Sequence, residues 1–277
     1  MGFKDILVHV DATPASQARL DFAAHFAKEH EAHLVALHVE AAPYVPADIM
    51  ATGMAASVLQ WQRELRRHRE AEVGGKVEAA RQRHGIEIEW RAIEGDVDDT
   101  LALHGRYVDL VIIGPGSDSL DLEQPELPSP GHVVIATGRP VLVLPKDYKA
   151  KSFGQRILLG WKSTPEAARA VHDALPLLAK ARNVTVTEVN PDLAGARRIA
   201  GGDIAKYLAR HGVAVTVSPV VAPDMDAGSL LLARAADIEA DLIVMGAYGH
   251  SRLREAVLGG ATRYILDHLD IPVLMAS

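Results

Sequence analysis

The chain has 277 residues, of which 48% are hydrophobic, and its net charge is −7. This length suits about two ordinary domains, each able to bury a core. The chain contains no cysteine, which excludes a disulfide framework, a thiolate metal site and a cysteine nucleophile. The negative charge argues against a nucleic-acid partner, because a duplex-binding surface must be positive.

The opening residues, Met1 to Val8, enter a strand-like run without the regions of a signal peptide. Apolar runs also stay shorter than the about 20 residues that a bilayer span requires. We therefore expect a cytoplasmic protein without a membrane partner.

Two stretches of the chain begin in the same way. The run from Ile6 to Pro14 is apolar and ends in Thr-Pro, and the run from Ile157 to Pro165 repeats it. Threonine can cap a helix, and proline is well tolerated in the first turn. Each stretch therefore predicts a strand followed by a helix.

The similarity between the halves recurs along the chain. Three further pairs of segments match: 83–86 with 210–213, 109–114 with 241–246, and 140–143 with 272–275. Their aliphatic runs are typical of strands buried on both faces of a parallel sheet. We expect strands near 5–10, 33–39, 86–93, 108–113, 140–144, 156–161, 184–189, 213–220, 241–245 and 272–275.

This alternation predicts an α/β fold of two tandem doubly wound units. Each unit would be a five-stranded parallel sheet with helices on both faces and right-handed crossovers. The polar run from Lys146 to Ser152 falls between the repeats. It places the two domains at 1–148 and 153–277.

The first half carries extra residues over 42–60. Met50, Met54 and Val58, followed by Trp61, recur at helical spacing. They predict a helix that packs on its own half or across the two halves, with a lid over a ligand as the alternative. Basic and acidic residues continue this helix and predict a solvated, ion-paired face: Arg63, Glu64, Arg66, Arg67, Arg69, Glu70 and Glu72.

A glycine-rich loop follows the fourth strand of the second half. Its spacing is Gly246, two residues, Gly249, nine residues, then Gly259-Gly260-Ala261-Thr262. Such glycines let backbone approach a ligand, and the free N–H groups of the next helix favour a phosphate. Thr262 could add a hydroxyl, and Arg252 or Arg254 a charge. The alternative is a tight structural connection.

The matching segment of the first half is different. It keeps Gly114 but has Ser117 in place of the second glycine, and then Leu127, Pro128 and Pro130. Proline has no N–H to offer a phosphate. Acidic residues also crowd the segment: Asp118, Asp121, Glu123 and Glu126. We expect the first half not to bind a nucleotide in this way.

The other patterns in the sequence are weaker indications of function. Five histidines, His9, His25, His30, His33 and His38, lie close in sequence but do not converge simply, which favours polar surface residues over a metal site. The chain has no hydrolase elbow, Walker loop or kinase signature. No obvious carboxylate pair for Mg²⁺ accompanies the glycine loop, which argues against an efficient enzyme.

The paired opening strands, the glycine loop and the closing Pro-Val-Leu strands together resemble the tandem-domain universal stress proteins of bacteria. The resemblance covers almost the whole chain. It implies an adenine nucleotide alpha hydrolase-like fold and pairing of the last strands in an intramolecular pseudo-dimer, with a further homodimer left open. In that family an aspartate after the first strand receives adenine. Asp11 holds that position in the first half, and Lys162 in the second.

The resemblance implies a stress-response regulator that binds ATP, ADP or AMP in its second half, with Mg²⁺ and the protein partner left open. Lys162 could instead meet a phosphate, and Trp161 could pack against the base. Weak ATPase activity at the same loop and a non-binding interaction scaffold are the alternatives. The implied site residues are Trp161, Lys162, Ser163, Val189, Met245, Gly246, Gly249, His250, Arg252, Gly259, Gly260, Ala261 and Thr262.

Overall fold

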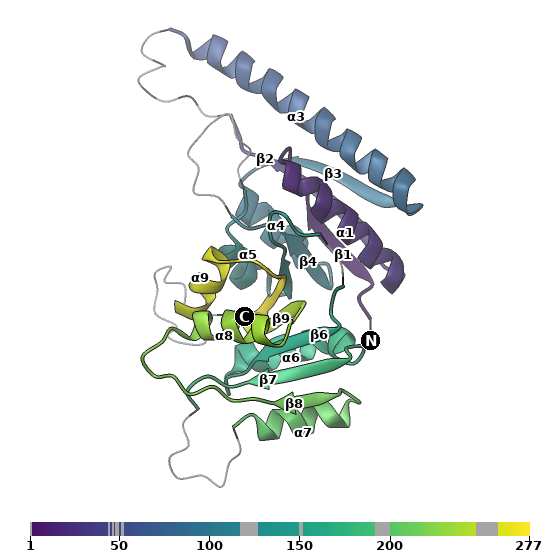
Figure 1. Cartoon of the computed structure of the whole chain (residues 1–277). Helices are drawn as coiled ribbons and strands as arrows, with labels where there is room; N and C mark the ends of the chain where they lie inside the picture. The colour runs from purple at the N-terminus through teal and green to yellow at the C-terminus, as the bar shows by residue number, and fades with distance from the viewer. Residues whose placement is uncertain are drawn as a thin grey trace.

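The computed structural model describes residues 2–43, 45, 47, 50, 53–116, 127–149, 152–191, 200–247 and 260–277. In this part of the chain, strands and helices alternate in two successive series, one in each half (Figure 1). The first half contains β1 (Asp5–His9), α1 (Pro14–His30), β2 (His33–Glu40), α3 (Ala55–His84), β3 (Ile88–Glu94), α4 (Val97–Gly105), β4 (Leu110–Ile113), α5 (Pro130–Thr137) and β5 (Val141–Val143).

The second half repeats this order. It contains β6 (Arg156–Gly160), α6 (Pro165–Leu178), β7 (Asn183–Thr187), α7 (Gly202–Arg210), β8 (Val215–Val217), α8 (Ala227–Asp237), β9 (Leu242–Gly246), α9 (Gly260–Asp267) and β10 (Val273–Ala276). All ten expected strands are confirmed. The largest difference concerns 213–220, of which only Val215–Val217 forms strand.

The strands form one sheet with the order β3-β2-β1-β4-β5-β10-β9-β6-β7-β8. The strands of each half are parallel to one another. At the centre, β5 and β10 pair antiparallel, with Leu142 opposite Leu274. This pairing confirms the expected pseudo-dimer and continues the sheet from one half into the other.

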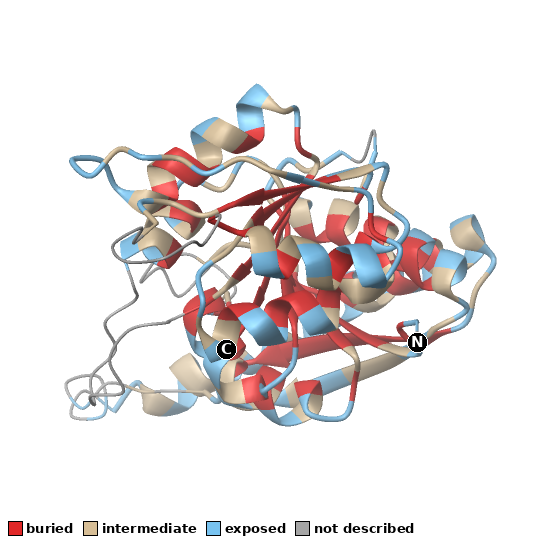
Figure 2. Ribbon diagram, turned by 90° about the horizontal axis from the view of Figure 1, so that it is seen from below, coloured by how far each residue is buried: buried red, intermediate tan, exposed pale blue. Residues whose placement is uncertain are grey.

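The two faces of the sheet are covered by different helices, which gives two hydrophobic cores. One core packs α1, α3, α6 and α7 on the sheet, and the other packs α4, α5, α8 and α9. Figure 2 shows the buried strands between helices whose inner faces are also buried. Aliphatic runs form these strands because both of their faces are removed from water.

The Thr-Pro pairs begin α1 and α6 as expected, but their threonines act differently. The Thr164 hydroxyl accepts a hydrogen bond from Ala167 N and caps α6. Thr13 makes no such cap, because its hydroxyl bonds the Asp11 carboxylate instead. The same dipeptide therefore serves different local networks in the two halves.

The expected inserted helix is α3, which begins at Ala55 and ends at His84 before a left-handed Gly85. Its C-terminal half buries Val73, Val77 and Ala80 against its own half, whereas Trp61 keeps 44% of its surface exposed. The earlier residues 44, 46, 48, 49, 51 and 52 lie outside the described part.

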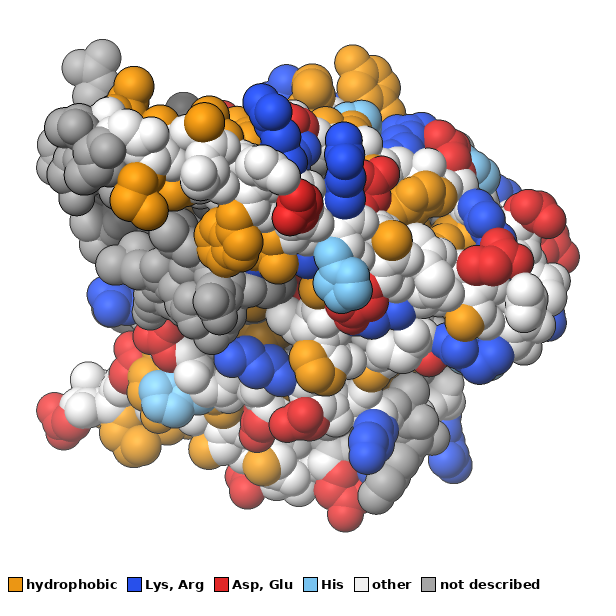
Figure 3. All heavy atoms as spheres, turned by 90° about the horizontal axis from the view of Figure 1, so that it is seen from above, with side chains coloured by type: hydrophobic (Ala, Val, Ile, Leu, Met, Phe, Trp, Pro, Cys, Tyr) orange, Lys and Arg blue, Asp and Glu red, His pale blue; other side chains and the backbone are white. Residues whose placement is uncertain are grey.

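The predicted ion-paired face of α3 is confirmed in part. Basic and acidic side chains are intermixed on the face seen from above (Figure 3). Arg66 pairs with Glu94 at 2.7 Å rather than with a neighbour on its own helix. For Arg69 the prediction of a solvated side chain is wrong, because it is only 9% exposed and pairs with Glu40 on β2 at 3.3 Å.

Within the described residues, no helix is long and apolar enough to cross a membrane.

Candidate functional site

The candidate site of the second half lies at the carboxyl ends of its strands. β6 pairs with β7 on one side and with β9 on the other, and Gly160 lies beside Met245. The chain runs outward from β6 in one direction and returns to β9 on the other side. Open α/β sheets bind ligands at such a switch in strand order.

Those of the predicted site residues that the structure describes lie at this edge. Trp161, Lys162 and Ser163 follow β6, and Val189 beyond β7 forms a bridge with Val220. Lys162 and Ser163 are exposed, whereas the Trp161 ring packs partly on the core. Of the other predicted residues, Met245 and Gly246 end β9, and Gly260, Ala261 and Thr262 begin the described part of α9. Gly249, His250, Arg252, Arg254 and Gly259 lie outside the described residues.

Gly246 has a structural role that the sequence does not reveal. It lies in extended β9 and is not among the glycines with a positive φ. A Cβ at this position would overlap the backbone N of Ala167 and lie 2.6 Å from the Glu166 carbonyl carbon. The close approach of α6 therefore explains this glycine.

Gly260 is less constrained. It is exposed, and a Cβ there would have the Asp226 Oδ2 atom at 3.4 Å as its nearest neighbour. Asp226 caps α8 and lies at the same edge. Asp226 is not among the residues predicted from the sequence, although an aspartate directly before a helical run is a capping signal.

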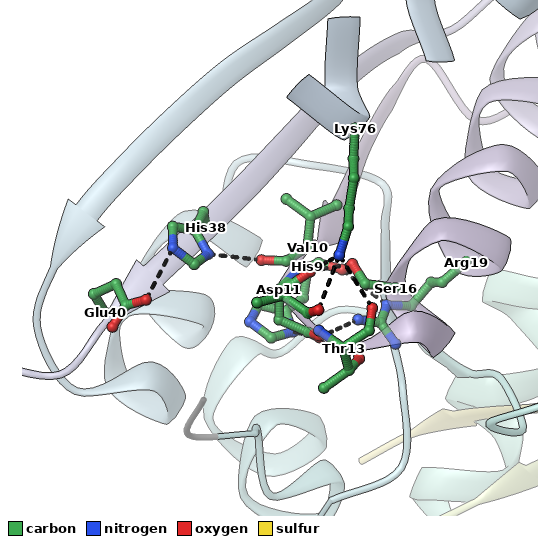
Figure 4. Close-up of polar contacts among 10 residues, drawn as sticks. His9, Val10, Asp11, Thr13, Ser16, Arg19, His38, Glu40 and Lys76 are labelled. Atoms are coloured by element: carbon green, nitrogen blue, oxygen red, sulfur yellow. Dashed lines mark hydrogen bonds and ion pairs between the residues drawn. The ribbon is translucent and has the colours of Figure 1, made fainter. Parts of the chain in front are cut away.

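The corresponding edge of the first half is filled by its own side chains (Figure 4). Arg19 of α1 donates to Asp11 Oδ2 at 2.5 Å and to the His9 carbonyl oxygen at 2.8 Å. Both charged side chains are buried. A Cβ at Gly114 would overlap Arg19 Nη1, so the guanidinium lies between the ends of β1 and β4. This is the switch point of the first half.

The Arg19 guanidinium stabilises the ionised carboxylate of Asp11. Burial alone would raise the pKa of Asp11, but Arg19, His9 and the bonds from Thr13 lower it below its usual range. Lys76 of α3 binds the loop between β1 and α1 by donating a hydrogen bond to the carbonyl oxygen of Ala12 at 2.9 Å. Asp11, the residue that would receive adenine, is therefore already bound by the protein.

His9 and His38 are buried beside this pair, so the prediction of surface histidines is wrong for both. Neither ring nitrogen of His9 has a hydrogen-bond partner in the described structure. Burial lowers the pKa of His9 to about 3, which outweighs the carboxylate of Asp11 at 3.7 Å. His38 Nδ1 is 3.0 Å from the Val10 carbonyl oxygen. Among the described residues, no group of three or more His, Asp or Glu could hold a metal ion.

In the first half, a protein side chain also occupies the region before α5, which corresponds to the predicted phosphate site of the second half. Asp98 of α4 accepts a hydrogen bond from Ser129 N at 2.7 Å, directly before α5, and α5 begins with Pro130. Burial raises the pKa of Asp98. A carboxylate thus occupies the approach to the helix end where a phosphate would bind. Ser117, Asp118, Asp121, Glu123 and Glu126 lie outside the described residues.

Comparisons with known proteins agree with this architecture. The model of the Universal stress protein family matches residues 2–121 and 154–277. Universal stress protein Slr1230 of Synechocystis sp. is 26% identical over 175 residues, which are 60% of this chain and 57% of that protein. The match thus spans just over half of that relative's length.

Solved structures show the same fold over the full chain. A universal stress protein from Archaeoglobus fulgidus is 19% identical with a TM-score of 0.71, covering 99% of this chain and 96% of its own. A functionally unknown protein from Pseudomonas aeruginosa PAO1 is 17% identical with a TM-score of 0.60, covering 99% and 92%. With both halves matched by the family model, this chain belongs to the universal stress protein family.

Proposed function

We propose that the chain binds an adenine nucleotide at the carboxyl edge of its second half and acts as a stress-response regulator through that binding. The difference between the two switch points supports this proposal. In the first half Arg19 places a guanidinium beside Gly114, where the second half has the backbone of α6 beside Gly246. The position of Arg19 is held in the second half by Ala170, which is buried within α6 and carries no charge.

The start of α9 also suits a phosphate better than the start of α5. Gly260 is exposed and its N–H is retained, whereas the first half has Pro128 at the matching position. Helix N-termini favour anions through their free N–H groups and their dipole. Lys162, exposed directly after β6, could add a positive charge at the same edge.

A matched pair of variants tests the site. Gly260→Leu adds bulk at the first described residue of α9 without displacing backbone, because a Cβ there makes only ordinary contact. Pro128→Leu changes the matching position of the first half. We expect Gly260→Leu to weaken binding of a fluorescent ATP analogue by about tenfold or more, an effect of about 1.4 kcal/mol. Pro128→Leu should bind like the wild type.

Unchanged affinity in Gly260→Leu, or loss of binding in Pro128→Leu, would contradict the proposal. Gly246 is a poor target for this experiment, because a side chain there would disturb α6. Mass spectrometry of natively purified protein adds an independent test, since a bound adenine nucleotide should co-purify. Phosphate release that Gly260→Leu abolishes would identify ATP hydrolysis at the same place.

A further inference from the structure

A pocket lies between the two halves, at the end of the sheet opposite to the candidate nucleotide site. It is formed where α1 of the first half and α6 of the second half end, beside the link 152–155 that leads into β6. Its volume is about 300 Å³, which is at the lower end of the range for small-molecule sites. Its wall includes Phe26, Glu29 and His30 of α1, Phe153 of the link, and Leu177 and Lys180 at the end of α6.

One side of this pocket is aromatic and apolar. Phe26 and Leu177 are buried, and the Phe153 ring packs edge-on against Phe26 with 5.7 Å between the ring centroids. The His30 ring centroid lies 4.3 Å from that of Phe26, with 33° between the two planes. Aromatic rings attract a further ring in offset or edge-on geometry. This side of the pocket therefore suits the flat, apolar part of a ligand.

The charges around His30 favour an anion. Burial lowers the pKa of His30, and the positive charges of Lys180 and Lys4 lower it further, against the opposing effect of Glu29. The Glu29 carboxylate also lies 3.4 Å from His25 Nε2 on its own helix. Two ammonium groups and one carboxylate thus act on the His30 ring, so the local charge is positive.

The ends of α1 and α6 would by themselves favour a cation, because helix carbonyl groups point outward there. Lys180, just beyond Leu178, already supplies such a cation at the end of α6. Two of the last carbonyl groups are also bonded by backbone, since Ala32 N donates to Ala27 O at 2.9 Å and Ala181 N donates to Leu178 O at 3.3 Å. The remaining preference of the pocket is therefore for a negative group.

We propose that this pocket binds a small aromatic carboxylate, with its ring against Phe26 and Phe153 and its carboxylate beside Lys180. The neutral His30 ring keeps one N–H, which can donate to the same carboxylate. Because the ligand contacts α1, α6 and the link, it stabilises the arrangement of the two halves. The site is separate from the proposed nucleotide site and does not depend on it.

Two probes that differ in the sign of their charge, para-fluorobenzoate and para-fluorobenzylamine, test this pocket by fluorine NMR on the full chain. For so small a ligand we expect para-fluorobenzoate to bind with a Kd of about 1 mM, and the amine to bind about tenfold more weakly. The bound carboxylate should also raise the pKa of His30, which the pH dependence of the His30 Cε1 proton signal measures. Excess ATP should not displace para-fluorobenzoate, because the nucleotide site lies at the other end of the sheet.

Lys180→Gln should weaken the binding of para-fluorobenzoate by about fivefold, because it removes the cation and keeps a long polar side chain. Lys206→Gln on α7, where the lysine side chain is 73% exposed, is the matched control and should bind like the wild type. Equal binding of the two probes, displacement by ATP, or an equal loss in Lys206→Gln would each overturn the proposal. Absence of para-fluorobenzoate binding would also overturn it and would leave the proposed nucleotide site unaffected.

Discussion

His9 is a buried imidazole at the end of β1 that stays neutral in the folded protein, with a pKa of about 3. An unfolded chain takes up this proton as the pH falls below about 6.5. The stability that depends on neutral His9 is therefore complete above pH 6.5 and is lost between about pH 6.5 and 3, at about 1.4 kcal/mol per pH unit.

The prediction is that His9→Leu becomes less sensitive to acid. Between pH 7 and 5 the wild type should lose up to about 2 kcal/mol of unfolding free energy through His9, and the variant should not show this part of the loss. Urea unfolding at the two pH values measures it. His25→Leu is the control, since the His25 side chain is 65% exposed. Identical acid sensitivity in His9→Leu and the wild type would contradict the assignment.

The Asp11–Arg19 pair is buried, so its partners depend on each other. Arg19→Met should leave the Asp11 carboxylate buried without its cation and cost about 3–5 kcal/mol. Combining it with Asp11→Leu should recover most of this loss, because a neutral pair avoids the desolvation of both charges. Urea unfolding of the single and double variants forms a double-mutant cycle. Additive losses would show that the two side chains act separately.

At the scale of elements, α3 is stabilised along only part of its length. Val77 is 1% exposed in the packed half, whereas Val58 in the other half is only partly buried. Val77→Ala should cost about 2 kcal/mol through a lost contact and a cavity, and Val58→Ala well under 1 kcal/mol. Thermal and urea unfolding compare the two. Equal losses would mean that the whole helix is held equally.

The elements could be predicted from the sequence because their signals are local. Strands buried on both faces appear as aliphatic runs, and Thr-Pro marks the start of α1 and α6. The burial of Arg69 and His38 could not be predicted, since it depends on partners from other elements, such as Glu40 and Trp90. The reason for Gly246 likewise lies in α6, about 80 residues away in sequence. At the candidate site, the glycine spacing predicts a ligand loop after β9 but does not point to Asp226.

For the whole molecule, the continuous sheet predicts that the halves unfold together. Leu142 and Leu274 are fully buried at the central pair of strands, so separation would expose both. Leu208→Ala in α7, far from this pair, should shift the unfolding transitions reported by Trp90 in the first half and Trp161 in the second by the same amount. Tryptophan fluorescence of single-tryptophan variants measures each half. A shift confined to Trp161 would show independent halves.

The covalent link between β5 and β6 has a consequence for how the two halves can differ. Two separate copies would pair at random and would depend on protein concentration, but halves joined in one chain meet at a high effective concentration. The first half, in which Arg19 lies at the switch point, is therefore always paired with the second half of the same chain. The first half can keep side chains such as Arg19 that stabilise it. The two unlike halves are also present in equal amounts at any expression level, because each chain carries one of each.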